Sequence, residues 1–281
     1  MISLYTKSNA AFSLPPARPL SPPSTSNLSH FARARRDEGK RTSLPTPITA
    51  AALSKSSIHQ DEECNCVFGK KEYWDQMYGG KDETGQFVTA AVDHRPSDAY
   101  SWYCGWDELQ PFWTMLVPDQ KSHVVIAGIG NDPAPVRMYD AGWTTMMGYD
   151  YSQSGVDRAR ELFGVGRDTV DLITADARKL PLDAASVGAT LDKGTLDAIY
   201  ITGKDIFRDS VEEMGRVTAT DGCVVSISTV IGPDDLLSAF DNPLWECVHD
   251  GSLAFAPDGE ATIDLGAELY SWKRTAVPYD S

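Results

Sequence analysis

The sequence of 281 residues lacks the marks of several protein classes. No run of apolar residues approaches the roughly 18–20 that a membrane-spanning helix needs, so we expect no membrane span. Only five cysteines occur, an odd number scattered along the chain, which predicts a reducing compartment and no disulfide framework. Cys64 and Cys66 have no second pair at zinc-ligand spacing. We therefore expect no metal site.

Basic residues are scarce in most of the chain. Residues 1–60 hold eight lysines and arginines against two acids, whereas the remaining 221 residues carry 17 basic and 38 acidic side chains, a balance of −21. Proteins bind phosphate backbones mainly through lysine and arginine, so we expect no nucleic-acid partner. An acidic body favours a cationic partner instead.

Residues 1–60 differ from the rest in composition. They contain seven of the 17 prolines and eleven serines, show no sustained apolar period, and have no acid before Asp37. A disordered extension and an organelle transit peptide both have this composition, and both interpretations stay open. We expect a tail of residues 1–60 and a folded domain of residues 61–281. The protein is then cytoplasmic or, with a transit peptide, directed to a mitochondrion or plastid.

From residue 72 onwards the pattern predicts alternating helices and strands. Expected strands cover residues 123–127, 144–149, 170–174, 187–191 and 223–228, and expected helices cover residues 72–78, 107–116, 136–141, 156–163, 206–217 and 234–240. Asp107 is the expected cap of its helix. Such alternation predicts an α/β fold around a mainly parallel sheet. Two final strands, at 245–248 and 269–273, have no helix between them and are expected to pair antiparallel.

A glycine turn follows the first expected strand. Gly128 and Gly130 stand where a backbone turns sharply and a ligand approaches closely. Asp150 lies twenty residues past Gly130, the position of a ribose-binding acid in nucleotide-binding α/β folds. Pro133 departs from the dinucleotide fingerprint, and Asp176 adds an acid after the third strand. Together these residues favour S-adenosylmethionine over a dinucleotide.

Several short motifs occur in one order along the chain. They are Tyr73-Trp74-Asp75-Gln76-Met77-Tyr78, Tyr100-Ser101-Trp102-Tyr103, the glycine turn, Asp150-Tyr151-Ser152 and Asp192-Lys193-Gly194-Thr195-Leu196-Asp197-Ala198. Over about residues 72–275 the chain resembles the class I methyltransferases that methylate lysines of translation elongation factor 1-alpha, and their mitochondrial relative that acts on citrate synthase. The resemblance implies a Rossmann-like class I methyltransferase fold, with a mainly parallel seven-stranded sheet and an antiparallel C-terminal hairpin.

The resemblance also implies which residues contact S-adenosylmethionine. They are Trp74, Tyr78, Trp102, Gly128, Asp150, Tyr151, Asp176, Ala177 and Lys193. Asp150 would bind the ribose hydroxyls and Asp176 the adenine amino group, with Tyr151 and Ala177 flanking the purine. Trp74 and Tyr78 lie four residues apart on one helix face, where rings can cover a sulfonium cation or simply form a core pair. For Lys193 the alternative is a solvated surface lysine.

The expected reaction is methyl transfer from S-adenosylmethionine. A lysine acceptor must be neutral to attack, which requires a dry site or a base. Asp192 is the base candidate, although it could instead cap the following helix. The expected partner is a protein with an exposed lysine. The alternatives are a small-molecule acceptor and a non-catalytic S-adenosylmethionine-binding protein. The chain departs from the family pattern at Ile129, at Asp132 where the family usually has serine, at Val187-Gly188 and in a longer loop between Tyr78 and Trp102, and a divergent loop often signals a changed acceptor.

Overall fold

The computed structural model describes residues 67–79, 99–255 and 263–279. The expected boundary between a tail of residues 1–60 and a domain of residues 61–281 lies outside these residues. So does the expected loop between residues 80 and 98. In the described part of the chain, no helix is both long and apolar enough to cross a membrane.

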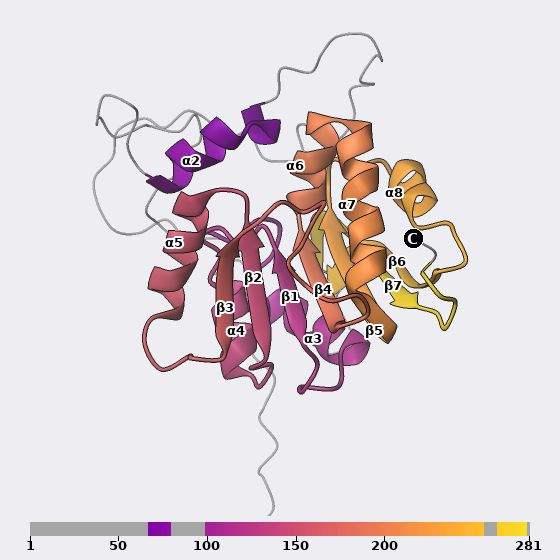
Figure 1. Cartoon of the computed structure of the whole chain (residues 1–281), viewed down its shortest axis with the longest axis horizontal. Coiled ribbons are helices and arrows are strands. Elements are labelled where there is room, and N and C mark those ends of the chain that lie inside the picture. The colour runs from indigo at the N-terminus through magenta and orange to yellow at the C-terminus, as the bar shows by residue number, and fades with distance from the viewer. Residues whose placement is uncertain (1–66, 80–98, 256–262, 280–281) are drawn as a thin grey trace, which may run out of the picture. The chain divides into compact units, whose positions relative to one another are not determined.

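Seven strands form one sheet in the order β3-β2-β1-β4-β5-β7-β6 (Figure 1). Their bounds are β1 (Val124–Ala127), β2 (Met146–Asp150), β3 (Val170–Thr174), β4 (Val187–Lys193), β5 (Thr218–Ser228), β6 (Trp245–Phe255) and β7 (Ile263–Arg274). The first five strands pair in parallel. β7 runs antiparallel to both β5 and β6. The expected seven-stranded, mainly parallel sheet with an antiparallel C-terminal pair is confirmed.

Helices precede the first strand and lie in several connections of this sheet, although β4 follows β3 with no helix among the described residues between them. In chain order the helical elements are η3 (Val67–Gly69), α2 (Lys71–Gly79), α3 (Trp106–Leu116), α4 (Ala134–Asp140), α5 (Gln153–Phe163), α6 (Thr195–Thr202), α7 (Lys204–Val217) and α8 (Pro233–Ala239). Helix α5 begins after Ser152, because the Ser152 side chain caps it by accepting a hydrogen bond from the Gly155 backbone N–H. α2 packs on α5, and η3 packs on α6.

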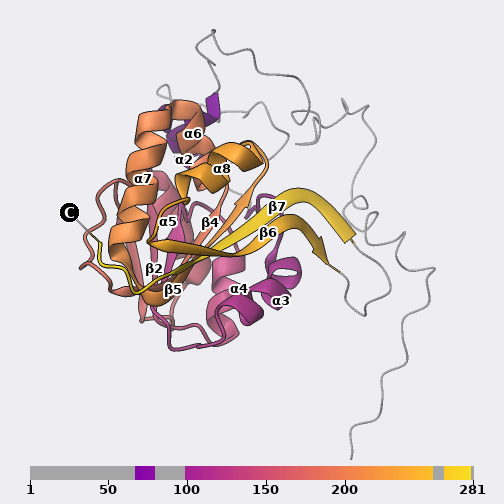
Figure 2. The same ribbon diagram turned by 90° about the vertical axis from the view of Figure 1, so that its right-hand side faces the viewer.

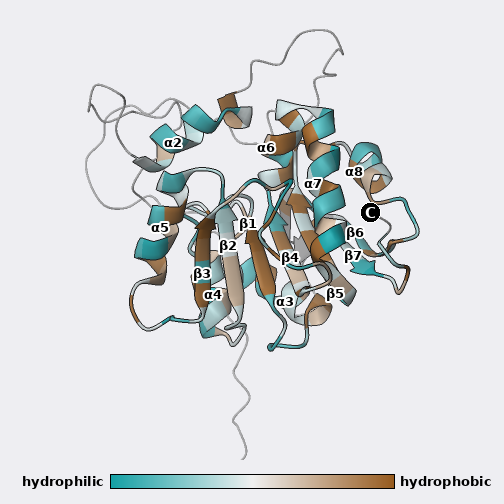
Figure 3. Ribbon diagram, viewed as in Figure 1, coloured by the Kyte–Doolittle hydropathy of each residue, from teal (hydrophilic) through white to brown (hydrophobic). Residues whose placement is uncertain are grey.

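Both faces of the sheet are covered. The core under α3, α4 and α5 contains Val124 and Ile126 of β1. The opposite side chains of the same strand, Val125 and Ala127, belong to the core on the other face, where α6, α7 and α8 lie. Figure 2 shows α3 and α7 on opposite sides of the strands. This double burial explains the continuous apolar run of β1, which is brown in Figure 3 while much of the surface of α7 is teal.

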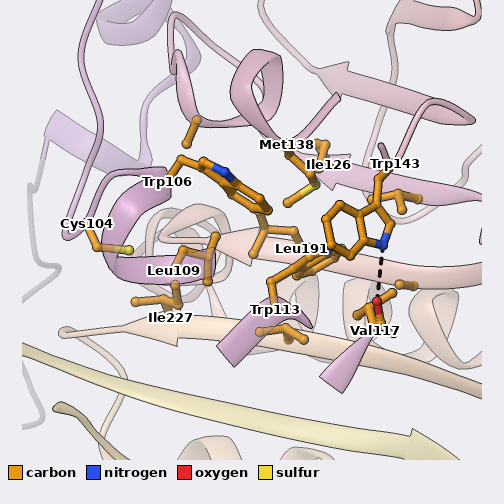
Figure 4. Packing of buried hydrophobic residues seen from close by; sticks show 14 of the residues in the cluster. Cys104, Trp106, Leu109, Trp113, Val117, Ile126, Met138, Trp143, Leu191 and Ile227 are labelled. Atoms are coloured by element: carbon orange, nitrogen blue, oxygen red, sulfur yellow. Dashed lines mark hydrogen bonds between the residues drawn. The ribbon is translucent and has the colours of Figure 1, made fainter. Parts of the chain in front are cut away.

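Three tryptophans form the centre of the core beneath α3 (Figure 4). The Trp143 ring meets the rings of Trp106 and Trp113 edge to face, with centroids 5.9 and 6.5 Å apart. The Trp143 indole N–H donates to the Val117 carbonyl over 3.1 Å. A buried indole that keeps a hydrogen-bond partner adds apolar area without an unpaired polar group. The packing fixes α3, and the loop before it, against the sheet.

Several expectations about element ends are wrong. The strands expected at 223–228, 245–248 and 269–273 are the longer β5, β6 and β7, and no expected helix corresponds to α6. Asp107 does not cap α3: the N-cap is Gly105, whose backbone N–H donates to the Glu108 carboxylate over 2.9 Å. Asp107 lies within the first turn and binds the Arg137 guanidinium through two hydrogen bonds of 2.7 and 2.8 Å. The fourth strand continues past Leu191, because its parallel pairing with β5 extends to Lys193.

Candidate active site

The glycine turn joins β1 to α4 at the carboxyl edge of the sheet. Gly128 has φ +55° and Gly130 has φ +45°, values that glycine adopts at low cost. A Cβ atom at Gly128 would lie 2.2 Å from the Thr195 hydroxyl oxygen, and one at Gly130 would lie 2.4 Å from the Tyr78 hydroxyl oxygen. The turn therefore needs glycine at both positions for conformation and for space.

Asp150 ends β2 directly beside this turn. Its carboxylate is only 3% exposed and accepts hydrogen bonds from the Gly130 N–H at 3.1 Å and the Ser152 N–H at 2.8 Å. Burial raises the pKa of Asp150 to about 6, against the lowering effect of these two backbone donors. Each carboxylate oxygen can accept more than one hydrogen bond. Asp150 thus retains acceptor capacity for hydroxyl groups of a ligand.

The expected purine-binding residues follow the next strand. The Ala175 N–H donates to the Asp150 carbonyl over 2.9 Å, which places the segment after β3 beside the end of β2. Tyr151 is 38% exposed, and Ala177 is half-buried. Asp176 lies two residues beyond the end of β3 and is exposed, with the Arg178 guanidinium 2.5 Å away. The hydrogen bond from Arg178 lowers the pKa of Asp176.

Aromatic rings of α2 and of the loop before α3 meet over the glycine turn. The Trp74 and Tyr78 rings stack with centroids 5.7 Å apart, and Trp74 meets Trp102 edge to face at 6.0 Å. Tyr78 is buried, and its ring lies 3.0 Å from the position of a Cβ atom at Gly155. Ring faces of this kind attract cations. The arrangement combines a core contact with a surface suited to a positively charged ligand.

A buried ion pair completes this side of the site. The Lys193 ammonium lies 2.6 Å from the Asp132 carboxylate, and the two side chains are 6% and 15% exposed. Lys193 also donates to the Cys104 carbonyl over 2.9 Å. Asp132 further accepts from the Ser101 hydroxyl at 2.5 Å and from the Ala134 N–H at 2.9 Å. Lys193 is therefore not a solvated surface lysine.

A pocket lies between these groups. Its lining includes Tyr78, Tyr100, Trp102, Gly128, Gly130, Asp132 and Lys193. The lining comes from the ends of β1 and β4, from α2 and from the loop before α3. In open α/β sheets, ligands bind outside the carboxyl ends of the strands, where strand order reverses. Here the order reverses at β1, between β2 and β4.

Known proteins were compared with this chain. No protein-family model matches it. The eEF1A lysine and N-terminal methyltransferase of Mus musculus is 26% identical over 166 residues, which are 57% of this chain and 22% of that protein. The methyltransferase srdJ of Neurospora crassa is 25% identical over 202 residues, 68% of this chain and 77% of that protein. The chain thus spans about a fifth of the length of the first of these relatives.

A solved structure shares the fold of this chain. A structure titled "Conversion of a Disulfide Bond into a Thioacetal Group during Echinomycin Biosynthesis" matches with a TM-score of 0.52 at 16% identity, covering 73% of this chain and 92% of that one. This likeness concerns the fold. The chain resembles the class I S-adenosylmethionine-dependent methyltransferases in sequence and in fold. The relatives support methyltransferase activity and do not determine the acceptor.

Four of the nine residues expected to contact S-adenosylmethionine line one pocket, and a fifth adjoins it. Tyr78, Trp102, Gly128 and Lys193 line it, and Asp150 adjoins it through the glycine turn. Sequence reasoning did not select Tyr100 or Asp132 as site residues, although both line the pocket. A signal for Asp132 was present, since it is a charged residue where the family usually has serine. The pairing of Asp132 with Lys193 gave no local signal, because the two residues lie 61 positions apart.

Asp192 has a different place in this methyltransferase-like fold. It is fully buried and is absent from the lining of the pocket. One carboxylate oxygen accepts from the Thr195 and Leu196 N–H groups, both at 3.0 Å, at the start of α6. The other accepts from the Ser226 hydroxyl at 2.6 Å. Burial raises the pKa of Asp192 to about 7. These contacts are those of a helix cap, the alternative weighed above.

Proposed function

We propose that the protein transfers a methyl group from S-adenosylmethionine to a protein lysine. The observation that supports this most is the buried hydrogen bond between the Gly130 N–H and the Asp150 carboxylate, at the carboxyl edge of a class I methyltransferase sheet. It brings the glycine turn and the ribose-type acid into contact. In nucleotide-binding α/β folds these two features bind a nucleoside together.

The donor set fits this cofactor. Gly128 and Gly130 let the Thr195 and Tyr78 side chains approach the turn closely, and Asp150 offers buried acceptors for two hydroxyl groups. Tyr151, Asp176 and Ala177 are the proposed purine contacts, and Trp74, Tyr78 and Trp102 the proposed cover for a sulfonium cation. Lys193 is the remaining proposed contact. When bound, S-adenosylmethionine supplies the electrophilic methyl group.

The residues of the chain are proposed to align the acceptor and keep water away. Alignment is the main task in such a transfer, because well-oriented reactants gain most of their rate from proximity. The aromatic rings of Tyr78, Tyr100 and Trp102 make a wall that excludes water, and a dry wall favours the neutral form of an amine. Asp132 contributes a carboxylate to the same pocket. The role of Asp192 as a base stays a prediction, since its contacts are those of a cap.

A small-molecule acceptor is the second candidate. The srdJ relative matches a larger share of this chain than the lysine and N-terminal methyltransferase does, at nearly equal identity. Its name states a methyltransferase without an acceptor. A non-catalytic S-adenosylmethionine-binding protein is the third.

One experiment separates these candidates. The protein is incubated with labelled S-adenosylmethionine and cell extract, with and without prior complete proteolysis and with and without removal of small molecules by dialysis. A protein-lysine acceptor predicts label in a protein band that proteolysis of the extract abolishes and that amino-acid analysis assigns to methyl-lysine. Label that survives proteolysis but not dialysis would indicate a small molecule. Binding without transfer would indicate the third candidate.

A further inference from the structure

Three residues before α3 form an unusual turn. The Cys104 N–H donates to the Trp102 carbonyl over 2.7 Å, two residues back, and the residue between them, Tyr103, has φ +63°. An i to i+2 hydrogen bond around a positive φ is a γ-turn of the rare, strained kind. Glycine, asparagine or aspartate occupy most positive-φ positions, and a bulky aromatic residue there costs free energy. Something in the surrounding structure must hold Tyr103 in this conformation.

A hydrogen bond to a buried carboxylate keeps Tyr103 in this conformation. The Tyr103 hydroxyl donates to one oxygen of Asp197 over 2.6 Å. Asp197 is only 3% exposed, and its carboxylate also accepts from the Ser228 hydroxyl at 2.5 Å and from the Thr229 and Ile231 N–H groups at 3.1 and 3.3 Å. These partners belong to the end of β5 and the residues after it. Asp197 therefore ties the turn to the carboxyl edge of the sheet.

The Tyr103 ring is fixed as well. A Cβ atom at Gly194, directly after β4, would lie 2.8 Å from a ring carbon of Tyr103, so the ring rests on a glycine. Burial raises the pKa of Tyr103 far above its usual range, with Asp197 adding to the shift. The hydroxyl is therefore protonated, and a donor, at neutral pH.

The two neighbours of Tyr103 are connected to the site. Trp102 lines the pocket and contacts the rings of Tyr100 and Trp74 at 5.1 and 6.0 Å. The carbonyl of Cys104 accepts from the Lys193 ammonium, which also lines the pocket and pairs with Asp132. A straighter backbone at Tyr103 would redirect both groups. The strain is thus located where it sets the positions of two parts of the pocket wall.

We infer that Tyr103 is a positioning residue for methyl transfer and that Asp197 is its anchor. The inference rests on the proposed function, because the pocket that the turn shapes is the proposed site of transfer. Tyr103 does not line the pocket and acts through Trp102 and through the Cys104–Lys193 contact. Asp197 contributes to the same positioning, because it accepts the hydrogen bond that Tyr103 donates.

The test compares Tyr103→Phe with the wild type and with Tyr139→Phe. The first variant keeps the ring and loses the bond to Asp197. The control also loses one tyrosine hydroxyl bond, to Thr169, which precedes β3 at the opposite edge of the sheet from the pocket. The labelled acceptor protein is purified from the extract, and kcat and KM for it are measured well below the melting temperature, after circular dichroism has shown equal folded fractions. We expect kcat to fall at least about tenfold in Tyr103→Phe and to stay within about twofold in Tyr139→Phe.

A second variant covers the case that Tyr103→Phe does not fold. Ser228→Ala removes one donor from Asp197 without touching the turn and should lower kcat by a smaller factor. Equal kcat in all folded variants, with a lowered melting temperature in Tyr103→Phe, would mean a purely structural role and overturn the inference. No transfer by the wild type, despite binding of S-adenosylmethionine in calorimetry, would instead refute the proposed function.

Discussion

Replacing Asp150 with asparagine is the sharpest single perturbation of the proposed cofactor site. The carboxylate is almost fully buried and already receives two backbone N–H groups, from Gly130 and Ser152. Asparagine has the same shape but only one oxygen, so one of these donors would face an amide N–H group. The ribose hydroxyls would also lose a charged acceptor.

The expected size of the effect follows from the hydrogen bonds involved. A hydrogen bond to a charged group contributes about 1.5–3 kcal/mol. Losing one such bond to the ligand should raise the dissociation constant for S-adenosylmethionine about 10- to 150-fold. Isothermal titration calorimetry measures this directly. Asp140→Asn is the matched control, because Asp140 is an exposed acid that pairs with Arg167 away from the pocket.

The pH dependence of binding gives a second, independent readout. The pKa of Asp150 is raised to about 6, so the wild type should bind S-adenosylmethionine more weakly as pH falls through 6 and the acceptor is protonated. Asp150→Asn should not show this change between pH 7 and 5. An unchanged dissociation constant in a folded Asp150→Asn protein, together with the same pH profile as the wild type, would place the ribose elsewhere.

Three further predictions concern the turn, the cap and the tail. Gly130→Ala should weaken S-adenosylmethionine binding at least about tenfold in calorimetry and lower the melting temperature, because its Cβ atom would strike the Tyr78 hydroxyl in a strained conformation. The raised pKa of Asp192, about 7, means that the native state holds its proton more tightly than the unfolded state. This contribution to stability is therefore present below about pH 4 and is lost as pH rises to 7. Urea titrations at pH 5 and 7 should show a smaller loss of unfolding free energy in Asp192→Asn than in the wild type. An equal loss in both proteins would contradict a buried cap at Asp192. Deleting residues 1–60 should leave the melting temperature within a few degrees and S-adenosylmethionine binding intact, since their composition cannot bury a core; failure to fold would show that they pack on the domain.

Local patterns carried most of the information about the fold. The continuous apolar run at 123–127 predicts a buried parallel strand and a short strand is expected at 170–174; the structure has β1 and β3 there. The glycine turn and Asp150 were connected by a spacing of twenty residues, and the structure joins them by a hydrogen bond. These features depend on residues close in the chain, which is why periodicity and spacing reveal them.

The features that sequence reasoning missed depend on contacts between distant residues. The start of α3 was misassigned because its N-cap is a glycine, whose backbone N–H donates to Glu108. No capping side chain therefore marks this position. The burial of Lys193 depends on Asp132 and on the carbonyl of Cys104, 61 and 89 positions away. Nothing in the residue type of Tyr103 signals a positive φ, since the turn is imposed by Asp197 from another part of the chain.

The place of β7 between β5 and β6 has a consequence during synthesis. Strand β6 leaves the ribosome before β7, yet among the strands that the structure describes its only hydrogen-bonded neighbour is β7. A nascent chain that ends before residue 263 therefore has β5 as the edge of its sheet and β6 without a pairing partner. Unpaired strand edges are the parts of a folding intermediate that aggregate. Between the emergence of β6 and of β7, both β5 and β6 thus have edges that can pair with another chain.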